Sequence, residues 1–556
     1  MPKAIDRRTV LANPVGVPEQ ATQEAAYSGG GDSLSRRPEN AVVDKRRHYV
    51  LPGAVNTVTP LYVHQAIGVA RMVRAAQQAG YFALLDKCGL GKTIQAIYAA
   101  ECLRQLGVVR KVIVICKPDL VQGWYDEIQE HNPACRVHVL HGREPHDRKW
   151  NGTADGHLIN FELLGRKPAR SGKKITVSNV FNHRQLLLSH DAVRMAAYMR
   201  KYSCAIVVDE AHKIKNLTAR ITATLCSLAG LARARFILTA TMNAESPLDV
   251  WSQIHFLDGG RLLGRSYKAF EQQYAITYDI NVGGRDGFGG RTVSKVSGYK
   301  NLTMLRNQIA TLSLSRRKEQ CLDLPPKIPK VRNVVAVGSQ LKLLRTIRDR
   351  IGALLAKEDQ LISLQPGTTL ASCIQDLIRA AAMPCVVDPT VTQSAKLDSL
   401  REILMETEEQ VIVWCVHRNV VDAIADALPG AERVRGGIDA IQRAQAVARF
   451  KTGVSRVLVC TVGTMSQGHN LQMASHAVYF QLDWSRLQWT QSQDRIHRIG
   501  QKHSVVVERL LMPTSLDLYI DATLQGKVKV AETLEEGGVT SEVVVSKKHL
   551  LDNLKW

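Results

Sequence analysis

The chain has 556 residues and a formal net charge of +22, from 73 Lys and Arg residues against 51 Asp and Glu residues; this length indicates about three to four domains, and the charge favours a polyanionic partner over a merely basic surface. The eleven cysteines are scattered without a C-x-x-C pair, which argues against a disulfide or zinc framework and for a reducing compartment. No stretch approaches the roughly twenty apolar residues of a membrane span, and the N-terminus lacks the apolar core of a signal peptide, so we expect a soluble intracellular protein without a membrane partner.

Residues 1–48 are polar and rich in turn-forming residues, so we expect a disordered or loosely docked basic tail. Within this tail, Lys45-Arg-Arg47 forms a short basic cluster. An import signal and a nucleic-acid contact are two interpretations of this cluster, and a solvated tail is the one that we prefer.

Residues 49–260 alternate between apolar runs of strand length and helical patterns, which predicts a parallel sheet flanked by helices. The predicted strands are residues 81–85, 112–116, 157–159, 206–208 and 236–238, and a helix is predicted over residues 93–103.

The first of these strands leads into a glycine-rich stretch, Asp86-Lys-Cys-Gly-Leu-Gly-Lys92-Thr93. A glycine-rich turn between a strand and a helix directs backbone N–H groups and the positive end of the helix dipole at one anion. We expect Lys92 to reach the β- and γ-phosphates of a nucleotide and Thr93 to bind Mg²⁺. The strict pattern has glycine where this chain has Asp86, so a turn that binds nothing is the alternative.

A second motif, Asp209-Glu-Ala-His212, follows an apolar run at residues 205–208. An apolar run that ends in an acid is typical of a buried parallel strand whose carboxyl end faces a ligand. We expect Asp209 to hold Mg²⁺ through water and Glu210 to polarise the attacking water. Adjacent acids are common on surfaces, but in this order with Lys92 and Thr93 they predict a nucleoside triphosphatase.

Residues 261–393 differ in pattern from the preceding part, and we interpret them as connecting and protruding material. Residues 281–292 are a glycine-rich turn or hairpin tip, and helical patterns follow at residues 341–357 and 370–382. Arg285 and Arg291 in the tip are candidates for contacts with a phosphate backbone, and a hairpin that contacts nothing is the alternative.

Residues 394–535 return to alternating strands and helices, which predicts a second α/β lobe, and residues 536–556 form a C-terminal tail. This lobe has no phosphate loop, but Arg495 and Arg498 lie three residues apart on a probable helix and therefore on one face. Such arginines reach across a cleft to the γ-phosphate, whereas an ordinary solvated face is the alternative. The predicted strands of this lobe are residues 411–415, 457–460, 477–480 and 505–510.

In order along the chain, eight segments resemble the Swi/Snf-type DNA-dependent ATPases of helicase superfamily two. The resemblance spans nearly all of residues 55–530 and implies two RecA-like lobes, residues 49–260 and 394–535, with helical protrusions between them. In this family an aspartate commonly stands at the position of Asp86. The eight segments are residues 61–65, 85–93, 117–124, 209–216, 238–241, 394–397, 467–471 and 491–501.

The resemblance also implies a role for each matching residue. Gln65 is similar to the glutamine that reads adenine, and the nucleotide loop comprises Asp86, Gly89, Leu90, Gly91, Lys92 and Thr93. Thr93 and Asp209 are the implied Mg²⁺ ligands, and Glu210 is the implied water-activating acid. Arg495 and Arg498 resemble the fingers that reach the γ-phosphate across the cleft, with Gln491 beside them near the water. His212, Thr239 and Thr241 resemble residues that couple hydrolysis to lobe movement. The segments that usually follow the DNA backbone contain Lys117, Asn160, Arg418 and Thr464.

The chain departs from the family pattern in three places: Lys87-Cys88 replaces Glu-Met, Gly468-His-Asn470 replaces Gly-Leu-Asn, and Trp484-Ser-Arg486 replaces Trp-Asn-Pro. Its short protrusions most resemble the compact annealing-helicase-like branch. The absence of recognisable reader domains suggests a bacterial or viral source, with a cytoplasmic, nucleoid-associated location; a eukaryotic source would imply the nucleus.

The resulting hypothesis is a motor that hydrolyses ATP with Mg²⁺ in a cleft between two lobes, and thereby translocates on or remodels duplex or branched DNA in repair or replication. Because it would contact phosphates, its binding should be non-specific in sequence and sensitive to salt. The alternatives are a strand-separating helicase, an RNA-dependent ATPase and a non-enzymatic DNA-binding relic.

Overall fold

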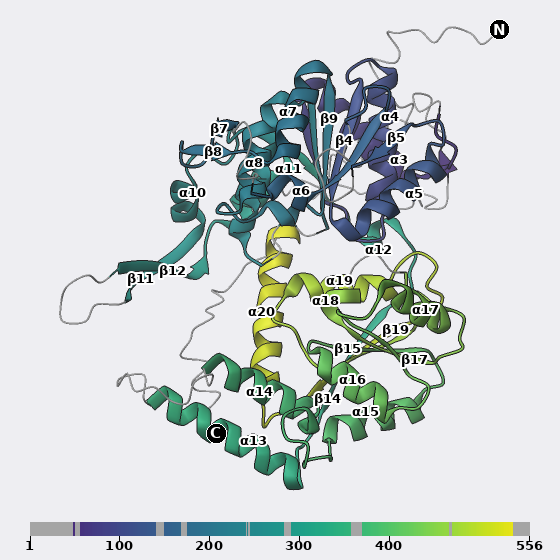
Figure 1. Cartoon of the computed structure of the whole chain (residues 1–556), viewed down its shortest axis with the longest axis vertical. Helices are drawn as coiled ribbons and strands as arrows, with labels where there is room; N and C mark the ends of the chain where they lie inside the picture. Colours follow the sequence, from purple (N-terminus) through teal and green to yellow (C-terminus); the bar gives the residue numbers. More distant parts are fainter. Residues whose placement is uncertain are drawn as a thin grey trace, which may run out of the picture. The chain divides into compact units, whose positions relative to one another are not determined.

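The structure, a computed structural model, describes residues 48–49, 56–140, 150–167, 175–240, 242, 245–282, 291–356, 370–465 and 470–536. The chain divides into two compact units, and the boundary between them falls after Asp323: residues up to Asp323 belong to the first unit and residues Leu324–Lys529 to the second. Figure 1 shows the elements of each unit. No helix within the described ranges is long and apolar enough to cross a membrane. The predicted tails, apart from His48 and Glu536, lie outside the described residues.

The first unit is built on a seven-stranded sheet with the order β13-β3-β10-β9-β4-β6-β5, in which every neighbouring pair is parallel. Because all strands run the same way, their carboxyl ends meet at one edge, where ligands of such sheets bind. The strands are β3 (Tyr81–Leu84), β4 (Lys111–Cys116), β5 (Val137–Val139), β6 (Gly156–Asn160), β9 (Cys204–Asp209), β10 (Ala234–Leu238) and β13 (Ser313–Leu314).

Helices cover both faces of this sheet (Figure 1). Along β4, Val112, Val114 and Cys116 pack with α3, α4 and α5 in one hydrophobic cluster, whereas Ile113 and Ile115 are fully buried on the opposite face. Burial on both faces explains why the strands are continuous apolar runs. The helices are α3 (Val63–Gln78), α4 (Lys92–Gln105), α5 (Val121–His131), α6 (Phe161–Gly165), α7 (His190–Lys201), α8 (Arg220–Leu228), α9 (Val250–Asp258), α10 (Tyr267–Tyr274), α11 (Leu302–Ala310) and α12 (Lys318–Cys321).

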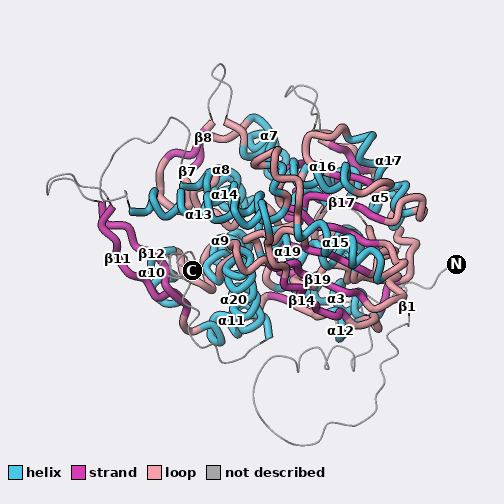
Figure 2. Tube along the Cα trace, turned by 90° about the horizontal axis from the view of Figure 1, so that it is seen from below, coloured by secondary structure: helices cyan, strands magenta, loops and turns pink. Residues whose placement is uncertain are grey.

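Three antiparallel strand pairs lie outside the main sheet of the first unit. They are β1 (His48–Tyr49) with β2 (Leu61–Tyr62), β7 (Thr176–Ser178) with β8 (Gln185–Leu187), and β11 (Ala275–Val282) with β12 (Arg291–Tyr299). The β11–β12 pair projects away from the sheet in both views (Figures 1 and 2). Arg291 begins β12, while residues 283–290, with Arg285, lie outside the described residues.

The second unit contains a six-stranded sheet with the order β14-β19-β18-β15-β17-β16, again parallel throughout. Its strands are β14 (Lys327–Asn333), β15 (Val411–Cys415), β16 (Glu432–Val434), β17 (Val457–Thr461), β18 (His476–Tyr479) and β19 (Val505–Leu511). Its helices are α13 (Gly338–Ala356), α14 (Leu370–Ala382), α15 (Ala395–Glu406), α16 (Arg418–Ala427), α17 (Ala440–Lys451), α18 (Val462–Met465), α19 (Arg486–Ile496) and α20 (Asp517–Glu536), the last of which runs past the end of the unit.

The predicted α/β fold, with two lobes of parallel sheet flanked by helices, is confirmed. The interpretation of residues 261–393 as separate connecting material did not anticipate that this segment supplies a strand to each sheet: β13 pairs with β3, and β14 pairs with β19. The strand pattern of these two segments is weak in the sequence for physical reasons. Strand β13 has two residues, and β14 is an exposed edge strand that contains Pro329 and four charged or polar residues, a composition typical of edges rather than of buried strands.

Candidate active site

The glycine-rich loop connects the end of β3 to the start of α4, at the edge where the carboxyl ends of the strands meet. Gly89 and Gly91 have φ angles of 88° and 74°, which non-glycine residues adopt at a cost. A Cβ atom on Gly91 would also overlap the side-chain amide of Gln65. No side chain caps the N-terminus of α4, so its first N–H groups suit an anion. The Nζ of Lys92 donates to the carbonyl of Asp86 at 2.8 Å.

Gln65, the candidate adenine reader, lies against this loop. Its Nε2 donates to the carbonyl of Leu90 at 3.4 Å, and its Oε1 accepts from the N–H of Tyr62 at 3.0 Å. Gln65 is 5% exposed and Leu90 is fully buried. The structure therefore brings Gln65, Leu90 and Gly91 together, as their shared candidate role requires.

Asp209 and Glu210 lie at the carboxyl end of β9, on the same sheet edge as the loop. The indole Nε1 of Trp124 donates to Asp209 Oδ2 at 2.8 Å, and the N–H of Glu210 donates to Asp209 Oδ1 at 2.9 Å. Glu210 has a left-handed backbone, with φ 53° and ψ 54°, a strained conformation that is frequent at functional sites. The Nδ1 of His212 lies 3.2 Å from Glu210 Oε2.

The electrostatic surroundings of the two acids differ. Burial and the neighbouring charge of Glu210 raise the pKa of Asp209, and the donated bond from Trp124 and the ammonium of Lys92 oppose this. For Glu210, burial alone would raise the pKa, but the contact with His212 and the ammonium groups of Lys117 and Lys92 lower it overall. Lys92 therefore acts on both acids, which brings the two sequence motifs into one site.

The candidate coupling residues occupy the same region. His212 is 5% exposed in the 3-10 turn Ala211–Ile214, and burial lowers its pKa, which favours the neutral imidazole. Thr239 is fully buried directly after β10, and its N–H donates to the carbonyl of Leu84 at 3.2 Å. Thr241 lies outside the described residues.

The four candidate DNA contacts have different environments. Lys117 is 5% exposed and acts on Glu210, a position that fits the acids better than a DNA backbone. The Oδ1 of Asn160 accepts from the N–H of Leu163 at 3.0 Å and caps α6. Arg418 is exposed at the start of α16. Thr464 accepts from the hydroxyl of Thr461 at 2.8 Å in α18.

In the second unit, the predicted single helix face for Arg495 and Arg498 is wrong. Helix α19 ends at Ile496, so Arg495 lies in its last turn and Arg498 lies beyond it. At the end of α19 the carbonyl of Ile496 accepts from Gln501 Nε2 at 3.3 Å, and Gly500 turns the chain further on with a φ of 95°. Gln491, on α19, is 1% exposed.

The oxygen donors near the loop suit Mg²⁺ better than a metal ion whose ligands are all protein side chains. Nowhere in the described ranges do three or more His, Cys, Asp or Glu side chains gather into a potential metal site. Mg²⁺ is usually held by one or two protein oxygens together with substrate phosphates and water. The carboxylate of Asp209 and the hydroxyl of Thr93 are oxygens of that kind, so the residues fit the ion if a nucleotide supplies the rest.

Three residues that lie around this site had no role predicted from the sequence. They are Trp124, which binds Asp209, and Gln95 and Arg316, which bind Asp86. Of these contacts, the sequence could have indicated only that Asp86 needs a partner, because an acid in a buried loop requires a compensating donor. Nothing in the local pattern says which residue provides it.

Comparison with known proteins gives two family matches along the chain. Residues 64–379, more than half of its length, match the SNF2-related domain, and residues 395–500 match the helicase conserved C-terminal domain. The core of a SWI2/SNF2 ATPase from Sulfolobus solfataricus in complex with double-stranded DNA covers 87% of this chain and 94% of its own, with 21% identity and a TM-score of 0.39.

Two curated relatives illustrate the range of similar proteins. The TATA-binding protein-associated factor BTAF1 of Arabidopsis thaliana is 25% identical over 84% of this chain and 25% of its own length. The DNA annealing helicase and endonuclease ZRANB3 of Mus musculus is 24% identical over 84% of this chain and 40% of its own length. The chain thus spans less than half of the length of either relative.

Proposed function

Because the chain belongs to the SNF2-related family, whose model matches residues 64–379, we propose that it is a DNA-dependent ATPase that uses hydrolysis of Mg-ATP to translocate on or remodel DNA. The observation that carries this proposal is geometric: the phosphate loop follows β3 and the acids Asp209 and Glu210 end β9, so both motifs lie at the carboxyl edge of one parallel sheet. A cradle for phosphates, a candidate metal ligand and a candidate base for water thus share one sheet edge.

The proposed roles follow from the chemistry of each group. The N–H groups at the start of α4 and the ammonium of Lys92 bind the phosphates, while Gln65 contacts the base. Asp209 and Thr93 hold Mg²⁺, which when bound neutralises charge on the β- and γ-phosphates. Glu210, kept ionised by its neighbours, orients and polarises the attacking water.

For the second unit, we assign Arg495 and Arg498 to the charge that develops on the transferred phosphoryl group. A single arginine in this role is worth roughly 10³ to 10⁵ in rate. Arg495 lies on α19, whereas Arg498 lies beyond the end of this helix. We therefore expect substitutions of the two arginines to differ in their effect on turnover. Gln491, on the same helix as Arg495, is a candidate for positioning water.

The proposed nucleic-acid partner is duplex or branched DNA, bound through its phosphates. The net charge of +22 supports a polyanionic partner, and a matched relative named as a DNA annealing helicase supports DNA as that partner. A role in repair or replication belongs to the same proposal. Strand separation and RNA dependence are the two other activities that the same residues would permit.

The test is ATP turnover with no nucleic acid, single-stranded DNA, blunt duplex, forked duplex and RNA, each at two salt concentrations. We expect duplex or forked DNA to stimulate turnover most, and the stimulation to fall steeply with salt because phosphate contacts release counterions.

Lys92→Ala and Glu210→Gln should abolish turnover. Equal turnover with and without polynucleotide, or unchanged turnover in Lys92→Ala, would overturn the proposal, and strand displacement on forked duplexes would favour a helicase instead.

A further inference from the structure

Asp86 occupies the position in the phosphate loop where the strict pattern has glycine, and its side chain is completely buried. A buried carboxylate without partners is very unfavourable. The ammonium of Lys92 donates to the backbone carbonyl of Asp86. The carboxylate is bound instead by Arg316, which lies 230 residues further along the chain.

Arg316 binds Asp86 with two parallel hydrogen bonds. Its Nε donates to Oδ1 at 2.9 Å and its Nη2 donates to Oδ2 at 2.5 Å, the fork geometry that makes arginine–carboxylate pairs strong and directional. The same guanidinium donates to Gln95 Oε1 at 2.9 Å and to the carbonyl of His64. Arg316 is 12% exposed, so water screens this pair little.

Gln95 relays this arrangement to the loop. With its Oε1 held by Arg316, its Nε2 donates to Asp86 Oδ2 at 3.1 Å and to the carbonyls of Leu90 and Gly91, both at 3.2 Å. In a planar trans peptide the C=O and the following N–H point in opposite directions. Holding these two carbonyls inward therefore turns the N–H groups of Gly91 and Lys92 outward, where an anion binds.

Two further observations fit this arrangement. Gly68 lies inside α3, where glycine is less favourable than alanine, and a Cβ atom there would overlap Gln95 Oε1 and lie 3.0 Å from Arg316 Nη2. The backbone also connects the two segments, because the N–H of Lys87 donates to the carbonyl of Arg316 at 3.1 Å. Arg316 thus holds the loop through both its main chain and its side chain.

We propose that Arg316 is a positioning residue for the nucleotide, acting through its ion pair with Asp86 and through Gln95 to present the N–H groups of Gly91 and Lys92 to the phosphates. This inference rests on the proposed nucleotide site and adds to it a residue from the segment by which the chain leaves the first unit. It also gives Asp86 a function: the acid anchors the relay, so the departure from glycine is not a defect of the loop.

The experiment measures binding of Mg-ADP by calorimetry and thermal unfolding of the full chain, for the wild type and for Arg316→Gln, Arg316→Lys and Gly68→Ala. We expect Arg316→Gln to weaken binding about tenfold or more, since it leaves Asp86 without its cation and releases Gln95. Arg316→Lys should recover part of the loss, because lysine restores the charge without the fork. Gly68→Ala should weaken binding from the opposite side of the cluster, which keeps the test valid if Arg316→Gln does not fold.

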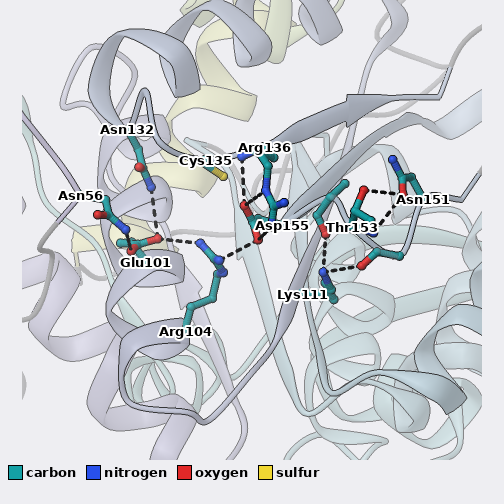
Figure 3. A network of polar contacts seen from close by, with 12 residues as sticks. Asn56, Glu101, Arg104, Lys111, Asn132, Cys135, Arg136, Asn151, Thr153 and Asp155 are labelled. Atoms are coloured by element: carbon teal, nitrogen blue, oxygen red, sulfur yellow. Dashed lines mark hydrogen bonds and ion pairs between the residues drawn. The ribbon is translucent and has the colours of Figure 1, made fainter.

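The matched control is Arg104→Gln. Arg104 is also a largely buried arginine of the first unit, paired with Asp155 at 2.8 Å and with Glu101 at 2.9 Å, but it lies at the opposite end of α4 from the loop, in the network of Figure 3. Arg104→Gln should lower the unfolding temperature without changing the affinity for Mg-ADP. The inference is overturned if Arg316→Gln and Gly68→Ala bind like the wild type, or if Arg104→Gln weakens binding equally. If the wild type binds no Mg-ADP, the proposed function itself fails, and the inference fails with it.

Discussion

Trp124 holds one oxygen of Asp209 from a buried position, 85 residues earlier in the chain. Groups that hold a metal ligand in place typically contribute about 10- to 100-fold in metal affinity. The indole also packs against the hydrophobic cluster of the first unit, so its removal would combine two effects. Only a replacement that keeps an aromatic ring separates the hydrogen bond from the packing.

At this scale we predict that Trp124→Phe raises the Mg²⁺ concentration needed for half-maximal turnover by about tenfold, with a smaller change in turnover at saturating Mg²⁺. The reason is that phenylalanine cannot donate to Asp209 Oδ2. The measurement is a Mg²⁺ titration of ATP turnover at fixed ATP. Trp251→Phe, at a buried tryptophan of α9, is the control; an equal shift in that variant would mean that lost packing, not the hydrogen bond, is responsible.

Among the elements, α14 and α15 are joined by one hydroxyl. The Oγ of Ser394 donates to the carbonyl of Ala382, the last residue of α14, at 2.7 Å, and accepts from the N–H of Leu397 in the first turn of α15 at 3.2 Å. Ser394 therefore caps one helix and satisfies the end of another. In the same turn, Lys396 is 1% exposed and pairs with Asp517 at 2.6 Å, so the Ser394–Leu397 motif has a structural role in the second unit.

We predict that Ser394→Ala lowers the free energy of opening of α15 by about 1–2 kcal/mol, because two buried backbone groups lose their partner. Hydrogen exchange of peptides that cover residues 394–406 measures this as about 5- to 30-fold faster exchange. Ser266→Ala, at the exposed cap of α10 with a longer bond of 3.4 Å, should change exchange less. Unchanged exchange in Ser394→Ala would contradict the bridging role.

At the scale of the whole molecule, a buried carboxylate connects three strands of the second unit. Glu508 on β19 accepts from Arg332 Nε on β14 at 2.8 Å, and its other oxygen lies 3.0 Å from His476 Nε2 on β18. Although burial alone would raise the pKa of Glu508, the contacts with His476 and Arg332 lower it below the ordinary value of 4.5. A carboxyl group with a lowered pKa in the folded state stabilises that state when it is ionised.

This stabilisation is present above the ordinary pKa and is lost as the pH falls through the lowered folded-state value. We therefore predict that Glu508→Gln reduces the stability of the second unit near pH 7 and makes its stability less dependent on pH in the acid range below about 5. The measurement is denaturant unfolding of the wild type and of Glu508→Gln between about pH 3 and pH 7. Parallel pH profiles for the two proteins would show that Glu508 does not contribute in this way.

The order of the motifs, the buried parallel strands and the glycine-rich turn before Lys92 could be predicted from the residues alone, because apolar runs and clusters of glycine are local patterns. The sequence also predicted two lobes and the acids Asp209 and Glu210 at a strand end. It misplaced Arg498, because two arginines three residues apart share a helix face only if the helix continues, and the pattern did not show that α19 ends at Ile496.

The surroundings of each functional group depend on segments that are far apart in the sequence and meet only in the folded chain. The pairs Arg316–Asp86 and Trp124–Asp209 join residues 230 and 85 positions apart, and no local pattern encodes such a pairing. Lys117 is another example: the resemblance implied a segment along the DNA backbone, yet the fold buries this lysine, and its ammonium acts on Glu210. A charge can be buried when the fold brings an opposite charge to it, and that encounter depends on how the elements pack rather than on the residues next to it in the chain.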